Sequence, residues 1–320
     1  MMIDLYPFSG YVVVVFGLDD SGIACAKTLQ SSGATVWAWD DDQAKRTHAE
    51  TLDLTLTDLS EIDWREPVSM VIEPRIAHAK DDFHPYVSEA KKVNCEIISD
   101  VELLARVQRE SAYVGVVGHQ GRALAADVIS YVMKLCGREA ETTGLTGQSV
   151  LDLYPLELNG AYVLDMPSDK IDITVSITYD VAIWLNFDQK SIIGNNTVIE
   201  ERKAMSWVFH RQTKPKTAII NIDDPVSLEV YQTLEKAEEQ ALIAVSTTSL
   251  VAGGIGVQDE WLIDDREGTA LQVIKLSDVT SSAVPGYYAA AVAAYACAVA
   301  IGLQSHAAMA CLNSYALPEN

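Results

Sequence analysis

The chain has 320 residues, of which 49% are hydrophobic, and a formal net charge of −22 at pH 7. This length allows about two domains, and the apolar fraction is typical of a chain with a packed core rather than a disordered one. Because nucleic acids and anionic membranes are bound through basic surfaces, the acidic balance argues against both as partners.

Five cysteines are scattered along the chain without CxxC spacing, which is typical of reduced thiols in a cytosolic protein. No secretory signal is expected, because Asp4 stands where a basic segment should be and no cleavage site follows residues 12–16. The uncharged stretch 287–303 is Ala-rich and falls short of the ~20 strongly apolar residues of a spanning helix, so we predict a buried helix there. The sequence therefore predicts a cytoplasmic protein.

The chain opens with the pattern of a β-α-β unit. A β-branched strand at 11–16 is followed by the turn Gly17–Gly22 and a helix, and a second strand at 35–39 ends in Asp40, Asp41 and Asp42. The middle glycine of a GxGxxG turn is replaced by Asp19, whose carboxylate would repel a pyrophosphate, so NAD is disfavoured. Two interpretations stay equally open: a merely tight turn, and a working nucleotide or UDP site.

Shorter β/α alternations complete the first domain. We predict strands at 69–72 and 96–98 and helices at 85–93 and 101–108, the last capped by Asp100. The predicted domains are 1–110 and 111–320.

The second domain begins with the layout of a phosphate cradle. The strand 114–117 runs into the loop Gly118-His119-Gln120-Gly121-Arg122, and a helical apolar pattern follows. Such a loop normally carries a Lys for the phosphates and a Ser or Thr for Mg²⁺. Here those places hold Arg122, Ala123 and Leu124. The layout predicts a cradle, and the residue types predict that its chemistry is lost.

The remaining pattern predicts an α/β fold, with a Rossmann-like N-terminal domain followed by a P-loop-type domain with a mostly parallel sheet. Predicted strands are 161–165, 171–177, 180–186, 217–221, 242–245, 261–263 and 271–274, and predicted helices are 203–209, 225–241, 287–303 and 306–315.

Six short motifs follow one another along the chain. They are GLDDSG (17–22) with WDDD (39–42), EPRI (73–76), SDVEL (99–103), VVGHQGR (116–122), NIDDP (221–225) and VPG (284–286). Their order and spacing resemble the Mur ligase family of peptidoglycan synthesis, with its GLGxSG, SPGI, (G/S)ExELF, (I/V)TGTNGKTT, NADDP and LPG motifs, closest to the MurD-like members that add D-glutamate. The resemblance covers essentially the whole chain and implies ligases that use ATP to form an acyl phosphate, which an amine then attacks.

The resemblance also implies the site residues. A UDP-muramoyl-type ligand would be bound by Gly17, Ser21, Gly22, Asp40, Asp41 and Arg75. Gly118, Gly121 and Arg122 would form the nucleotide loop, and Asp165 and Lys203 would take the catalytic places of a metal-holding Glu and a carbamylated Lys. An active enzyme would need ATP and Mg²⁺; no resident metal site is predicted, and whether there is a protein partner stays open.

The departures from the family pattern outnumber the catalytic matches. The guanidinium of Arg122 is a planar fork, wider than the compact ammonium of a Lys. Neither Ala123 nor Leu124 can ligate a hard cation. No His-rich segment follows Asn186, the loop 144–147 lacks the family's Asn, and residues 317–320 lack its Arg. The family's third, C-terminal domain has no counterpart in these 320 residues. Losing one such group typically costs ~10²–10³-fold in rate.

Three hypotheses result. The preferred one is a degenerate MurD-like homologue with a binding or regulatory role, and the alternative is an active D-glutamate-adding ligase that needs its C-terminal domain. An NAD(P) oxidoreductase is disfavoured by Asp19.

His119 is predicted to be a solvent-facing loop residue rather than a general base, and His78 and His84 to be surface residues rather than metal ligands. Arg75 could meet a diphosphate or equally block its site.

Overall fold

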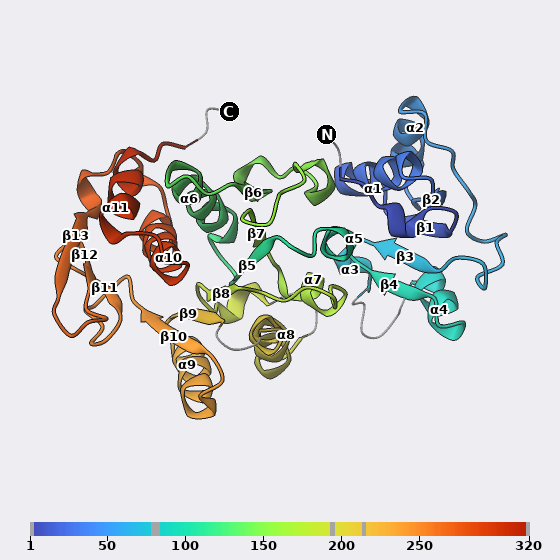
Figure 1. Ribbon diagram of the computed structural model, residues 1–320. Coiled ribbons are helices and arrows are strands. Elements are labelled where there is room, and N and C mark those ends of the chain that lie inside the picture. The colour runs from blue at the N-terminus through green and yellow to red at the C-terminus, as the bar shows by residue number, and fades with distance from the viewer. Residues whose placement is uncertain (1–2, 78–83, 193–195, 213–215, 318–320) are drawn as a thin grey trace. The chain divides into compact units, whose positions relative to one another are not determined.

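A computed structural model describes residues 3–77, 84–192, 196–212 and 216–317 (Figure 1). The chain forms two compact units. Unit 1 comprises Met1–Arg109, Gln148–Pro155 and Asp169–Ile177, and unit 2 comprises Glu110–Gly147, Leu156–Ser168 and Thr178–Asn320.

Unit 1 is built on a four-stranded parallel sheet in the order β2-β1-β3-β4. Its strands are β1 (Val12–Phe16), β2 (Thr35–Trp39), β3 (Ser69–Ile72) and β4 (Glu96–Ile98), and its helices are α1 (Asp20–Ser31), α2 (Gln43–Thr51), α3 (Pro74–Ala77), α4 (Pro85–Lys92) and α5 (Asp100–Val107). Because parallel strands point the same way, the turns after β1, β2 and β3 meet at one edge of the sheet. The predicted UDP-binding residues stand at this edge.

Unit 2 is built on a nine-stranded sheet in the order β13-β12-β11-β10-β9-β8-β5-β7-β6. The strands are β5 (Ala112–Val117), β6 (Ala140–Thr142), β7 (Ala161–Asp165), β8 (Val181–Trp184), β9 (Thr217–Asn221), β10 (Ala241–Val245), β11 (Ile255–Gln258), β12 (Trp261–Asp264) and β13 (Leu271–Lys275). Pairing is parallel from β6 to β11, and β12 is antiparallel to both its neighbours. The expected mostly parallel sheet is present.

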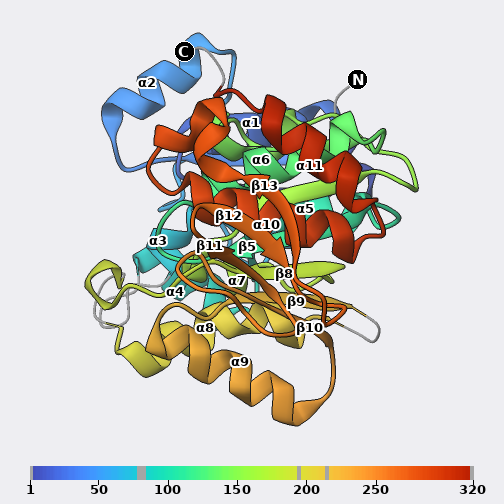
Figure 2. The ribbon, with the colours of Figure 1, turned by 90° about the vertical axis from the view of Figure 1, so that its left-hand side faces the viewer.

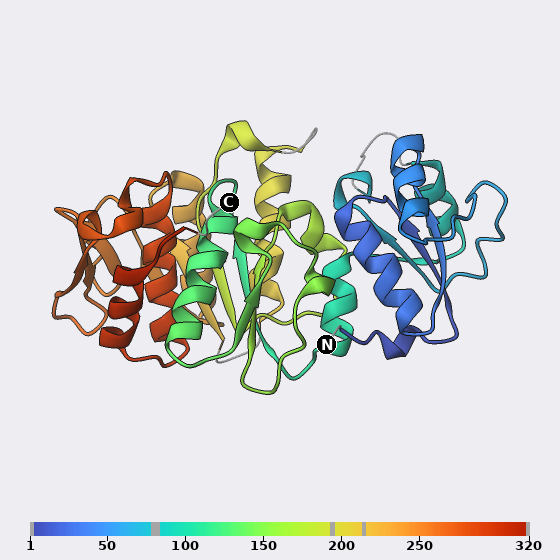
Figure 3. The same cartoon turned by 90° about the horizontal axis from the view of Figure 1, so that it is seen from above.

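Helices cover both faces of this sheet (Figure 2). One layer holds α6 (Arg122–Leu135), α10 (Tyr287–Ala300) and α11 (Ser305–Ser314), and the other holds α8 (Val198–His210) and α9 (Pro225–Ala237), while α7 spans Ser168–Asp172. Figure 3 shows the green α6 beside the red C-terminal helices. The Ala-rich α10 is buried on nearly all sides, as predicted, because small side chains let it lie close to α6. Within the described residues, no helix is long and apolar enough to cross a membrane.

Two local predictions are wrong. Residues 171–177 alternate apolar and polar side chains like a strand, yet Ile171 and Asp172 form the end of α7 and residues 173–177 lack regular structure. Ser99, not Asp100, is the N-cap of α5, because its hydroxyl accepts from the Glu102 N–H at 3.0 Å. The elements α2, β6 and β11 were not predicted.

Candidate functional site

The glycine loop of unit 2 connects β5 to α6 with two glycines in backbone conformations that other residues avoid. Gly118 has φ +150° and Gly121, the N-cap of α6, has φ +76°. A Cβ at Gly118 would lie 3.1 Å from the Leu185 side chain and 3.4 Å from the Asn186 backbone. The loop thus has the tight path of an anion cradle at a helix N-terminus.

The amide groups of this loop are occupied by a side chain of the protein itself. Asn186, which follows β8, accepts from the His119 N–H at 2.9 Å and from the Gln120 N–H at 3.0 Å. Its own amide nitrogen donates to the Gln120 carbonyl at 2.8 Å. Two of the N–H groups that an anion cradle would direct at a phosphate are therefore already paired.

Arg122 turns back onto the same loop from the first turn of α6. Its Nε donates to the Asp165 carboxylate at 2.5 Å, and its Nη1 donates to the Gly118 carbonyl. Asp165 is the last residue of β7, beside β5 in the sheet. The structure thus brings Gly118, Gly121, Arg122 and Asp165 together, with the arginine bonded to the loop and to the carboxylate.

The prediction for His119 is wrong. Its side chain is only 5% exposed, and its Nε2 lies 3.5 Å from the carboxylate of Glu201, which is 2% exposed. The His119 Nδ1 accepts from the Asp188 N–H at 3.1 Å, so the ring proton belongs on Nε2, which faces Glu201. This acidic partner, Glu201, lies on α8, 82 residues further along the chain, and was not predicted from the sequence.

Glu201 accepts two hydrogen bonds in unit 2 and lies beside the His119 ring. The Ser168 hydroxyl donates to it at 2.6 Å, the Asn196 amide donates at 3.0 Å, and the His119 Nε2 faces it at longer range. Burial raises the pKa of this carboxyl, but the donors from His119, Ser168 and Asn196 outweigh burial and hold the pKa below its usual value. Glu201 is therefore a buried carboxylate that polar groups of the protein stabilise.

Lys203, which the resemblance places in a catalytic role, is exposed on α8. Two residues earlier the helix presents Glu201 to the interior, and two residues later it presents Met205, which is 1% exposed. Glu201 and Met205 are four residues apart and therefore lie on the same face of α8, whereas Lys203 lies on a different face. Sequence reasoning missed Glu201, although its place one turn before the buried Met205 was a usable signal.

These residues fit ATP and Mg²⁺ poorly. Ala123 offers no ligand, and Leu124 is 6% exposed within the hydrophobic core of the unit. The carboxylates of Asp165 and Glu201 near the loop face Arg122 and His119. Among the described residues no group of three or more His, Cys, Asp or Glu side chains could hold a metal ion.

The NIDDP motif has a structural role in unit 2. The carboxylate of Asp223 accepts from the hydroxyl groups of Ser246, Thr247 and Thr248, which lower its pKa against the effect of burial. Asp224 caps α9. Both carboxylates are therefore engaged in turns and helix capping.

In unit 1 the glycine turn after β1 is also held by the chain's own carboxylates. The buried Asp40 accepts from the Leu18 N–H at 2.7 Å, and Asp19 caps α1 by accepting from the Gly22 N–H at 2.9 Å. Gly17 has φ +103°, and a Cβ on Gly22 would lie 1.9 Å from the Gly17 carbonyl oxygen. Gly22 therefore allows the close approach of helix and strand that the third glycine of such turns provides.

The other predicted ligand residues of unit 1 are tied to neighbours. The Ser21 hydroxyl donates at 2.8 Å to Asp100, whose carboxylate also lies 2.9 Å from the Lys170 ammonium. Burial opposes ionisation of Asp100, yet Lys170 keeps its pKa below the usual value. The exposed Asp41 lies 2.8 Å from the His84 Nε2.

Two predicted positions fall partly or wholly outside what the structure describes. Arg75 belongs to α3, but its side chain is outside the described part, and His78 lies outside the described residues altogether.

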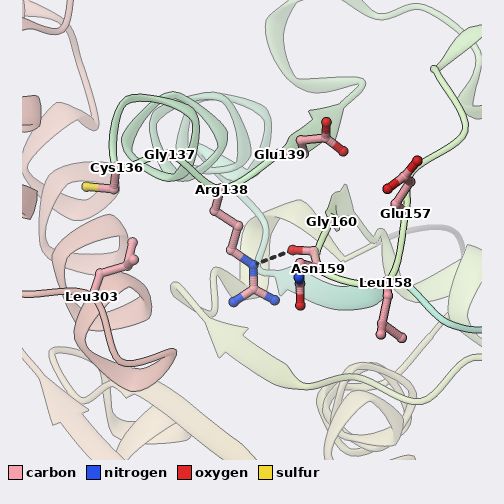
Figure 4. Close-up of a pocket in the computed structure, with 9 residues that line it drawn as sticks. All are labelled: Cys136, Gly137, Arg138, Glu139, Glu157, Leu158, Asn159, Gly160 and Leu303. Carbon is pink, nitrogen blue, oxygen red and sulfur yellow. Dashed lines mark hydrogen bonds between the residues drawn. The ribbon is translucent and has the colours of Figure 1, made fainter.

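A pocket of about 520 Å³ opens elsewhere in unit 2, at the other end of α6 (Figure 4). It is lined by residues 136–139, 157–160 and Leu303. Since α6 has 14 residues, the pocket is separated from the glycine loop by about 21 Å of helix. It is therefore not part of the loop site.

Comparisons with known proteins agree with this architecture. No model of a known protein family matches the chain. Solved structures with the same fold include the UDP-N-acetylmuramate:L-alanyl-gamma-D-glutamyl-meso-diaminopimelate ligase of Neisseria meningitides, with a TM-score of 0.66 and 14% identity over 97% of this chain and 99% of that one. A murein peptide ligase of Psychrobacter arcticus has a TM-score of 0.60 and 16% identity, over 96% of this chain and 68% of the other.

Proteins of similar sequence identify the family of the chain more closely than the solved structures do. It is 30% identical to the UDP-N-acetylmuramoylalanine–D-glutamate ligase of Phenylobacterium zucineum over 96% of this chain and 67% of the relative. The enzyme of the same name from Rhodospirillum rubrum is 28% identical over 92% of this chain and 63% of the relative. The chain spans about two thirds of the length of these relatives. It belongs to the Mur ligases, as a member of the MurD-like family of UDP-N-acetylmuramoylalanine–D-glutamate ligases.

Proposed function

We propose that this MurD-like protein is a non-catalytic homologue that binds a UDP-muramoyl-type ligand and no longer uses ATP. The proposal assigns the ligand to a first domain, residues 1–110, and the inactive nucleotide loop to a second domain, residues 111–320. Its role would be to bind or regulate within peptidoglycan precursor metabolism. The relatives are named for an enzyme that acts on UDP-N-acetylmuramoylalanine, which supports this choice of ligand class.

The double contact of Arg122 carries the proposal. A triphosphate at the N-terminus of α6 would meet a guanidinium already bonded to Asp165 and to the Gly118 carbonyl. It would also compete with Asn186 for the N–H groups of His119 and Gln120. Phosphoryl transfer depends on a Lys and Mg²⁺ that neutralise charge as it develops. These loop residues supply neither the Lys nor an Mg²⁺ ligand.

The ligand-binding part of the proposal rests on the turns after β1, β2 and β3. Apart from the Gly22 N–H, which Asp19 accepts, the first turn of α1 has N–H groups of the kind that bind a phosphate at helix N-termini. Asp41 is exposed, and its carboxylate could accept from a ribose hydroxyl or a uracil N–H. The proposed ligand residues are Gly17, Ser21, Gly22, Asp40, Asp41 and Arg75.

Calorimetric titration tests the two halves separately. UDP-N-acetylmuramoyl-L-alanine should give a saturable heat, and ATP with Mg²⁺ should give none up to about millimolar concentration, where a specific site would be detected. Asp41→Ala should weaken the first signal, while Glu50→Ala, which changes an exposed carboxylate on α2, should leave it unchanged. Micromolar ATP binding would overturn the non-catalytic assignment, and absence of heat with the UDP compound would overturn the ligand.

The second candidate is an active D-glutamate-adding ligase that needs further chain. The length of the relatives, which are about half as long again as this chain, supports this candidate. If this candidate holds, a version of the protein that extends to the relatives' length should convert ATP to ADP when Mg²⁺, the UDP compound and D-glutamate are present. No ADP release from such a version would exclude it.

A further inference from the structure

Two cysteines of unit 2 lie in contact across the helical layer. The Sγ atoms of Cys136 and Cys311 are 3.6 Å apart, although the residues are separated by 175 positions in the chain. Cys136 is the C-cap of α6, and Cys311 lies in α11. Both thiols are free in the reduced protein.

Side chains next to the cysteine pair hold the two helices in this register. The Tyr131 hydroxyl, five residues before Cys136, donates to the Ser314 carbonyl at 3.0 Å. The Tyr315 hydroxyl donates to Asp127 at 2.7 Å. Because these contacts anchor α11 on α6, the two thiols are in contact in the folded protein.

We propose that Cys136 and Cys311 form a dithiol site that a low-molecular-weight disulfide oxidises to an intramolecular disulfide, which fastens α11 to α6. The sulfur atoms have to approach by about 1.6 Å to reach the ~2.0 Å length of a disulfide. A change of side-chain rotamer and a small helix shift can provide this movement.

The reaction proceeds in two balanced exchange steps. The Cys136 thiolate attacks one sulfur of the external disulfide, forms a mixed disulfide and releases one thiolate. The Cys311 thiolate then attacks the Cys136 sulfur, forms the internal disulfide and releases the second thiolate. The protein loses two electrons and two protons, and the external disulfide becomes two thiols.

Cys136 is the accessible partner. It is only partly buried and lines the pocket at the end of α6, where Figure 4 shows its sulfur directed away from Arg138. Cys25, Cys95 and Cys297 are buried. Burial, and then the contact with Cys311, raises the pKa of Cys136 to about 11. Exchange should therefore be slow at neutral pH and accelerate about tenfold per pH unit in the alkaline range.

Thiol counting tests the proposal. Incubation with oxidised glutathione at pH 8 should lower the number of thiols titrated after denaturation from five to three. Peptide mapping should then find a bridge between Cys136 and Cys311, with a mass two hydrogens below the reduced pair. Dithiothreitol should reverse the change, and the oxidised protein should unfold at a higher temperature.

Variants separate this pair from the other thiols. Cys136→Ser and Cys311→Ser should both abolish the bridge, whereas Cys297→Ser, which changes a buried cysteine of α10, should still form it. Five thiols after oxidation, a bridge between other cysteines, or a stable glutathione adduct on Cys136 without a bridge would each overturn the proposal. Because these readouts involve neither ATP nor the UDP compound, their failure leaves the proposed function untouched.

Discussion

Arg122 and Asp165 form the link that closes the glycine loop, with the Arg122 Nε donating to the Asp165 carboxylate at 2.5 Å. A guanidinium at the first turn of α6 stands at the positive end of the helix dipole, which is unfavourable by itself. The Asp165 carboxylate and the Gly118 carbonyl offset this cost. The arginine is therefore held in the loop by contacts within the protein.

Breaking this link should cost measurable stability. The Arg122 and Asp165 side chains are 22% and 25% exposed, so solvent screens the pair only in part. We expect Arg122→Ala and Asp165→Asn each to lower the free energy of unfolding by about 1–2 kcal/mol. In urea denaturation the double variant should lose about 1 kcal/mol less unfolding free energy than the two single variants lose together. Strict additivity would contradict the link, and Arg65→Ala, which removes an exposed partner of Asp63, should produce no measurable change.

Asn186 should control the exchange of the loop amides. Asn186→Ala removes the acceptor shared by the His119 and Gln120 N–H groups. We expect hydrogen exchange at these two amides to accelerate at least about tenfold, because a lost bond of about 1.4 kcal/mol corresponds to that factor. Amides in the middle of α6 serve as the internal control. Unchanged exchange at His119 and Gln120 would show that Asn186 does not hold the loop.

Strand positions were predictable where local sequence and tertiary structure agree. The runs at 35–39, 69–72, 96–98, 161–165 and 217–221 match β2, β3, β4, β7 and β9, because β-branched side chains between turn residues favour buried parallel strands. The run 171–177 fails for the opposite reason. Its alternation buries Ile171 and Ile177 but leaves Val175 56% exposed, and no strand within the described part of the chain pairs with it.

The loop site was predictable only in part. The glycines and Arg122 are adjacent in sequence, so their motif predicts the turn and the missing lysine. The partners of the loop come from distant segments, since Asn186 follows β8 and Glu201 lies on α8. A histidine in a glycine loop gives no local sign of a carboxylate 82 residues away, so burial of His119 could not be predicted.

Glu201 should contribute pH-dependent stability. Its pKa in the folded protein lies below the ordinary value of 4.5, so on acidification the unfolded chain binds the proton first. The stabilising contribution is complete above about pH 4.5 and is lost as the pH falls through the folded pKa. Glu201→Gln should lower the free energy of unfolding at pH 7 by about 1–3 kcal/mol. Urea titrations at pH 7 and pH 3 should show a smaller difference in unfolding free energy between variant and parent at pH 3. An equal difference at both pH values would contradict the lowered pKa of Glu201.

Lys203 should behave as a surface residue. It is exposed on α8, away from the face that carries Glu201 and Met205. Lys203→Ala should change the free energy of unfolding by less than about 0.5 kcal/mol, as surface substitutions usually do. Intact-protein mass spectrometry in bicarbonate should find no carbamate adduct on the parent chain that the variant lacks. Such an adduct would restore the catalytic role that the family resemblance implies for this lysine.

Gly22 should be the least replaceable residue of the turn after β1. A Cβ there would lie 1.9 Å from the Gly17 carbonyl oxygen, and a backbone atom cannot move aside as a flexible side chain can. Gly22→Ala should therefore force α1 away from β1 and cost more than about 3 kcal/mol, at the upper end of overpacking effects. Gly137→Ala is the matched control, because its φ is +82° but nothing lies within 4 Å of the added carbon, and it should cost only about 1–2 kcal/mol. Thermal unfolding of both variants decides the matter. A Gly22→Ala protein as stable as the Gly137→Ala protein would mean that the turn opens without cost, and the close approach of α1 to β1 would then have no structural role.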